Sequence, residues 1–111
     1  SHYLRGEAFR GQGRKSEALE EYQWVLTRNP TDYWSILRMA ELVWQLERDA
    51  ASVERWLTEA ITIDAKSKWA YRNLAGLYAE TGRIHEATAL YEIVVQLDPN
   101  DPLATEWLLE R

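Results

Sequence analysis

The chain has 111 residues, enough for one domain with a modest core, and its 46% hydrophobic content argues for a folded chain. It has no cysteine, which excludes disulfides and thiolate-based metal or redox chemistry, and its net charge of −5 argues against a nucleic-acid partner. No apolar run approaches the roughly 20 residues that a membrane-spanning helix requires. We therefore expect a folded domain with no membrane span, bound metal or cofactor.

Apolar residues recur with helical spacing along the whole chain, and turn residues divide them into seven predicted helices. These helices span residues 1–11, 16–28, 33–45, approximately 49–63, 68–80, 83–97 and 102–111. Glycines separate the first two helices and the fifth from the sixth. Each of Asp32, Ser67 and Asp101 stands before a helix, at a position suited to an N-cap.

Residues 69–99 form a unit that is repeated towards the N-terminus. Its markers have a fixed spacing and are Ala75, Tyr78, Gly82, Ala87, Tyr91, Val94 and Pro99. The same spacing connects Gly6, Phe9, Gly13, Ala18, Tyr22, Val25 and Pro30. A middle copy contains Ile36, Met39, Ala40, Val43, Val53, Leu57, Ala60 and Ala65. This copy is one residue longer, and we expect the extra residue in its glycine-free turn, Leu46–Ala51.

This pattern resembles the tetratricopeptide repeat, a helix–turn–helix unit of 34 residues. The resemblance implies an all-α fold, an α–α superhelix of three helix–turn–helix repeats with a short C-terminal capping helix. The repeats would occupy approximately residues 1–32, 33–67 and 68–101 of a single domain 1–111, with the capping helix at 102–111. Because the first helix is cut short and the chain begins without Met, we expect a fragment of a longer protein.

Close packing explains the repeated residues. Small side chains such as Gly6, Ala75 and Ala87 would let neighbouring helices approach, and the aromatic markers would fill the space between them. The middle copy departs from the family pattern because it lacks the turn glycine and the closing proline. Arg5 also stands where the family usually has leucine.

In the tetratricopeptide family, the first helices of the pairs line a concave groove that holds a segment of a partner protein. The resemblance therefore implies a partner-binding groove of Tyr3, Trp34, Leu37, Arg38, Trp44, Trp69, Arg72 and Asn73. Trp and Arg are enriched at binding hot spots. We expect Arg38 and Arg72 to hold carboxylates or carbonyls, and Trp34 and Trp69 to form apolar walls. The alternative for the tryptophans is packing between successive repeats.

Charge indicates the kind of partner. Basic residues outnumber acidic ones on the predicted first helices, whereas the second helices are strongly acidic. We therefore expect a protein or peptide segment with apolar and some acidic side chains. Family members that clamp the acidic tails of heat-shock chaperones use Lys, Arg and Asn on the groove helices. At the corresponding positions this chain has Tyr3, Glu7, Arg38, Trp69 and Asn73, so we do not expect this mode of binding.

The sequence offers little for catalysis. His2 and His85 do not have the spacing of a metal pair, and adjacent glutamates such as Glu20 and Glu21 point in different directions on a helix. We expect no enzyme but a protein–protein interaction module or scaffold. The alternatives are structural stacking or self-association through an open apolar face of the N-terminal repeat, and a regulatory accessory domain of a larger protein. Localisation stays open, and the composition is compatible with the cytoplasm.

Overall fold

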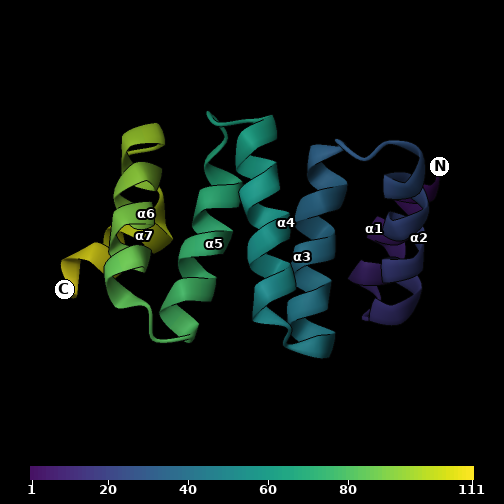
Figure 1. The fold of residues 1–111 in the computed structure, drawn as a ribbon, viewed down its shortest axis with the longest axis horizontal. Helices are drawn as coiled ribbons and strands as arrows, with labels where there is room; N and C mark the ends of the chain where they lie inside the picture. The colour runs from purple at the N-terminus through teal and green to yellow at the C-terminus, as the bar shows by residue number, and fades with distance from the viewer. The chain divides into compact units, whose positions relative to one another are not determined.

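The computed structural model describes residues 1–111 and contains seven α-helices and no strand (Figure 1). The helices are α1 (His2–Gly11), α2 (Lys15–Arg28), α3 (Tyr33–Glu47), α4 (Ala50–Ile63), α5 (Lys68–Glu80), α6 (Ile84–Leu97) and α7 (Pro102–Leu109). The predicted all-α fold is confirmed, and every helix boundary lies within two residues of the expected one. None of the helices is long and apolar enough to cross a membrane.

The helices form two compact units, Ser1–Trp56 and Leu57–Arg111. In the first unit α1 packs against α2, and α2 packs against α3. Ala18 and Tyr22 of α2 are fully buried. A Cβ atom added to Gly6 would lie only 2.8 Å from Cε1 of Tyr22, so the missing side chain lets α1 approach the tyrosine ring. This close contact confirms the packing role predicted for Gly6.

The second unit repeats this arrangement, with the short helix α7 in the place that α3 has in the first unit. In this unit α5 packs against α6, and α6 packs against α7. Ala75 and Ala87 are fully buried, as the repeat pattern predicts. The ring of Tyr91 lies 4.8 Å from the ring of Trp107, measured between centroids, and this contact attaches α7 to α6.

The turn between α3 and α4 differs from the other two turns and from our expectation. Gly13 and Gly82 have positive φ angles of 76° and 83°, a conformation that glycine adopts at little cost. Arg48 takes this role after α3, with a φ of 55°, and its backbone N–H donates to the Trp44 and Val43 carbonyls. The prediction of an extra turn residue is wrong. Instead α3 has 15 residues against 13 in α5, and only residues 48–49 connect α3 to α4.

Two of the three predicted N-cap residues make a capping hydrogen bond with their side chains. The side chain of Asp32 accepts a hydrogen bond from the Ser35 N–H, and the side chain of Asp101 accepts one from the Ala104 N–H. Ser67 stands at the N-cap of α5, but its side chain makes no capping hydrogen bond. Asp49 accepts a hydrogen bond of 3.2 Å from the Ser52 N–H at the start of α4.

Candidate partner-binding site

Burial in the hydrophobic core does not account for the tryptophans of this chain. None of the six tryptophans is among the fully buried residues. Trp34 lies in the first turn of α3 and is 43% exposed, and Trp69 lies in the first turn of α5 and is 39% exposed. Lys68 Nζ lies 4.8 Å from the centroid of the Trp69 ring, and the guanidinium carbon of Arg72 lies 5.4 Å from it. Both rings thus remain accessible on the helices that the family resemblance selects.

Two ion pairs connect α1 to α3 in the first unit. Arg38 Nε donates to Glu7 Oε1 at 2.9 Å. Arg10 donates to both oxygens of Glu41, from Nε at 2.6 Å and from Nη2 at 3.1 Å. The order of charge on α1, Glu7 then Arg10, is reversed on α3, Arg38 then Glu41. The four charges therefore cancel across this face.

Glu7 also binds a buried phenol. The Tyr22 hydroxyl donates to Glu7 Oε1 at 2.5 Å. Burial raises the pKa of Glu7, but hydrogen bonds from Tyr22 and Arg38 outweigh this effect, and the pKa lies below its ordinary value. Burial and the hydrogen bond to Glu7 raise the pKa of Tyr22. At neutral pH the first unit therefore holds a carboxylate between a neutral tyrosine and an arginine.

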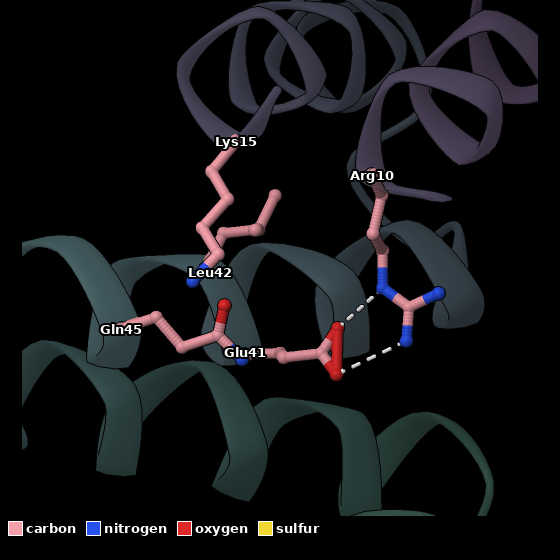
Figure 2. Close-up of a pocket in the computed structure, with 5 residues that line it drawn as sticks. All are labelled: Arg10, Lys15, Glu41, Leu42 and Gln45. Carbon is pink, nitrogen blue, oxygen red and sulfur yellow. Dashed lines mark hydrogen bonds and ion pairs between the residues drawn. The ribbon is translucent and has the colours of Figure 1, made fainter. Parts of the chain in front are cut away.

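A small polar hollow lies beside the Arg10–Glu41 ion pair (Figure 2). Its volume is about 300 Å³, and its lining residues are Arg10, Lys15, Glu41, Leu42 and Gln45. Leu42 is 1% exposed and forms the apolar part of the lining. Figure 2 shows the Glu41 carboxylate turned towards Arg10, while Lys15 extends from α2 alongside Leu42 towards Gln45.

In the second unit, two basic residues of α5 hold the start of α7. Lys68 Nζ lies 2.5 Å from Asp98 Oδ2 and 2.8 Å from Asp101 Oδ2, and Arg72 Nε lies 3.3 Å from Asp101 Oδ2. Burial raises the pKa of Asp101, but Lys68, the Ala104 N–H and Arg72 outweigh it and lower the pKa. Asp101 therefore both caps α7 and attaches it to α5.

Comparison with known proteins identifies the repeat. The sequence model described as "Tetratricopeptide repeat" matches residues 70–101. The matched residues include the repeat markers from Ala75 to Pro99. Residues 70–101 are therefore similar to one tetratricopeptide repeat. In the first unit α1 pairs with α2 as α5 pairs with α6 in the second unit. No curated protein matches the chain.

Solved structures support this fold for the whole domain. The first TPR of Spaghetti (RPAP3), bound to the HSP90 peptide SRMEEVD, has a TM-score of 0.89 at 23% identity and covers 98% of this chain and 86% of its own. The second TPR domain of human RPAP3, in complex with the HSP70 peptide SGPTIEEVD, has a TM-score of 0.86 at 22% identity, covering 99% and 91%. The Arabidopsis OM64 TPR domain has a TM-score of 0.85 at 22% identity, covering 94% and 85%.

The structure places the predicted groove residues in different surroundings. Leu37 is 2% exposed, so its selection as a partner contact is corrected, because a core side chain cannot reach a partner in this conformation. Tyr3 is half-buried with its ring edge against Tyr22, and Trp44 is half-buried under the guanidinium of Arg48. Asn73 is exposed on α5.

The two predicted groove arginines already have carboxylate partners within the domain. Arg38 is paired with Glu7, and Arg72 is paired with Asp101. The expected basic character of the first helices is therefore cancelled in large part by the chain itself. Sequence reasoning missed these pairs, although Glu7–Arg38 and Arg10–Glu41 share a separation of 31 residues and opposite charge order, which is a detectable signal.

The N-terminal face of the domain is less apolar than predicted. A hollow of about 460 Å³ between α1 and α2 is lined by Arg5, Phe9, Glu17, Glu20, Glu21 and Trp24. Three of these six residues are glutamates, and Arg5 Nε donates to Glu21 at 3.2 Å. Leu4, at 66% exposed, is the main apolar residue on the surface of α1.

Proposed function

We propose that this domain is a protein–protein interaction module that binds a segment of a partner protein on its first helices. The observation that carries this proposal is the exposure of Trp34 and Trp69 at equivalent places, the first turns of α3 and α5. Tryptophan is among the residues most enriched at binding hot spots. Two solved domains of the same fold have peptides bound, SRMEEVD and SGPTIEEVD, which supports a peptide as the ligand class.

In the first unit, Trp34 is the proposed anchor for an apolar side chain of the partner. Tyr3 lies on α1 and Arg38 lies on α3, and both of these are first helices of a pair. They add an aromatic ring and a guanidinium group to the proposed binding surface. Because Glu7 already neutralises the charge of Arg38, we propose that Arg38 donates hydrogen bonds to the partner segment and does not bind a free negative charge of it. This pairing also supports our expectation that the domain does not use the chaperone-tail clamp of its family.

In the second unit, Trp69 is the corresponding anchor, with Arg72 and Asn73 one turn further along α5. The ring of Trp69 has Lys68 and Arg72 near it, and both cations are held by Asp101. The exposed amide of Asn73 can donate to and accept from a peptide backbone. We propose apolar contact with Trp69 and backbone hydrogen bonds from Asn73.

We propose binding and not catalysis as the role of this domain. Glu7 of α1 pairs with Arg38 of α3, and Lys68 of α5 pairs with Asp101 at the start of α7, so these charged groups connect helices. Such pairs position helices and leave no acid and base facing a common reacting atom.

A selection experiment with matched variants tests the proposal. The domain is used to select binders from a displayed library of random peptides, and the affinity of an enriched peptide is then measured by calorimetry. Truncation of a hot-spot tryptophan costs at least about 2 kcal/mol, or roughly thirtyfold in affinity. We expect this loss for Trp34→Ala or Trp69→Ala, and no change for Trp24→Ala.

The control is well matched because Trp24 is 40% exposed but lies on α2, a second helix of a pair. If no peptide is enriched, or if the affinity survives both Trp34→Ala and Trp69→Ala, the proposed function is wrong. Circular dichroism of each variant confirms that its helical content is retained.

Self-association is a second candidate function, favoured by the exposure of Leu4 and Trp24 at the N-terminal face. A second copy of the chain would cover these side chains. Sedimentation at several concentrations distinguishes the two candidates. A concentration-dependent increase in mass that Leu4→Asp abolishes supports self-association, whereas a monomer at all concentrations excludes it.

A further inference from the structure

Almost every cation of the domain has a partner within the chain. Of the 13 basic residues, the arginines and Lys68 contact carboxylates, carbonyls, hydroxyls or aromatic rings. The side chains of Lys15 and Lys66 are the two exceptions. Lys15 lines the hollow in Figure 2. An uncompensated positive charge therefore lies beside a cavity in a chain whose net charge is −5.

The residues that line the hollow offer Lys15 no free negative charge. Glu41 is the one carboxylate in the lining, and both of its oxygens accept hydrogen bonds from Arg10. The hollow therefore contains two positive charges and one negative charge. Figure 2 shows the Lys15 side chain directed towards Gln45 and away from the Arg10–Glu41 pair.

The remaining lining suits a short side chain with a charged end. Leu42 is 1% exposed and closes the floor of the hollow, and the exposed Gln45 amide can donate a hydrogen bond. A volume of about 300 Å³ is at the lower limit of small-molecule pockets, so the hollow accepts one side chain more readily than a whole ligand.

We propose that this hollow binds the carboxylate of an acidic side chain of the partner segment, with Lys15 as its counter-ion and Gln45 as a hydrogen-bond donor. The inference rests on the proposed peptide-binding function and deepens it. It moves recognition of an acidic residue away from Arg38 and Arg72, whose charges Glu7 and Asp101 already neutralise. Glu41, held by Arg10, faces the same hollow and restricts the carboxylate to the side where Lys15 lies.

The first test uses a probe that does not depend on the partner. Blocked glutamate, N-acetyl-glutamate methylamide, is titrated into the ¹⁵N-labelled domain, and amide shifts are followed by NMR in the millimolar range. Blocked glutamine is the neutral control ligand. We expect shifts at Lys15, Leu42 and Gln45 with blocked glutamate only, and they should decrease as salt screens the charge.

Matched lysine variants locate the effect. Lys15→Gln should weaken binding of blocked glutamate about two- to fivefold, as for an exposed ion pair, whereas Lys66→Gln should leave it unchanged. The proposal is overturned if blocked glutamate produces no shifts at these residues. It is equally overturned if blocked glutamine gives the same shifts, or if Lys15→Gln binds as the parent does.

A peptide selected on the domain separates this inference from the proposed function. Each acidic residue of the peptide is changed to its amide in turn. We expect one such change to weaken binding to the parent domain about two- to fivefold and to have no effect on the Lys15→Gln variant. If the peptide binds through Trp34 or Trp69 but no acidic position is coupled to Lys15, the proposed function stands and this inference is wrong.

Discussion

Gly6→Ala is expected to destabilise the domain, even though alanine is the better helix former. The added Cβ would lie 2.8 Å from Cε1 of Tyr22, closer than Cβ atoms come to other side chains in folded proteins, and 3.0 Å and 3.1 Å from Cζ and Cδ1, which are also tight contacts. The Tyr22 ring cannot move away easily. It is fully buried, and its hydroxyl is held by Glu7 at 2.5 Å.

Gly76→Ala is the matched control for this substitution. Gly76 also lies inside a helix, α5, but its added Cβ would meet only the Tyr91 hydroxyl oxygen, at 3.9 Å. Each substitution gains about 1 kcal/mol of helix propensity, and this gain cancels when the two variants are compared. Overpacking costs about 1–3 kcal/mol, so the two variants should differ by that amount in their free energy of unfolding.

Urea unfolding followed by circular dichroism measures this difference. We expect Gly76→Ala to be as stable as the parent or more stable, and Gly6→Ala to be less stable than Gly76→Ala by about 1–3 kcal/mol. Equal midpoints for the two variants would refute the reasoning, because they would show that α1 does not require the close approach to Tyr22.

Three further predictions concern packing and charge. Ala87→Leu, at a fully buried position, should destabilise the domain by about 1–3 kcal/mol in thermal unfolding, and an unchanged Tm would show that the helix contact is loosely packed. Asp101→Asn should lower the Tm at pH 7, where asparagine retains the cap but loses both ion pairs. Because the folded-state pKa of Asp101 is lowered, its contribution is complete above about pH 4 and decreases as the pH falls from there through the folded-state pKa. The difference in Tm between parent and variant should therefore shrink progressively below about pH 4, and a constant difference contradicts this assignment. Glu41→Arg should destabilise the first unit, and adding Arg10→Glu should restore most of the loss; additive losses in the double variant would show that the two side chains are not coupled.

Periodicity and turn residues were sufficient to predict the seven helices, because each amphipathic pattern ends at a glycine, a proline or a capping aspartate. The end of α3 was less predictable. A glycine-free turn gave no signal for where the helix stops, and Arg48 adopts a left-handed conformation that is rare for residues other than glycine. The sequence therefore indicated a turn in the correct region but assigned the extra residue to the turn and not to the helix.

The candidate site was less predictable than the fold because it depends on contacts between distant residues. Spacing placed Trp34, Trp69 and Asn73 on exposed helix surfaces, and the structure agrees with that exposure. It could not show that Leu37 turns into the core or that Arg38 has a partner 31 residues away. Pairwise side-chain contacts of this kind follow from how the helices pack, which a single helical pattern does not determine.

The most direct test of the account uses the indole N–H signals of the six tryptophans in ¹⁵N NMR spectra of the domain. Each signal is assigned by substitution, and a peptide selected on the domain is then titrated. We expect the signals of Trp34 and Trp69 to shift with the peptide while that of Trp24 stays in place. Shifts confined to Trp24, or no shift of Trp34 and Trp69 at saturation, would contradict the claim that the first helices bind the partner.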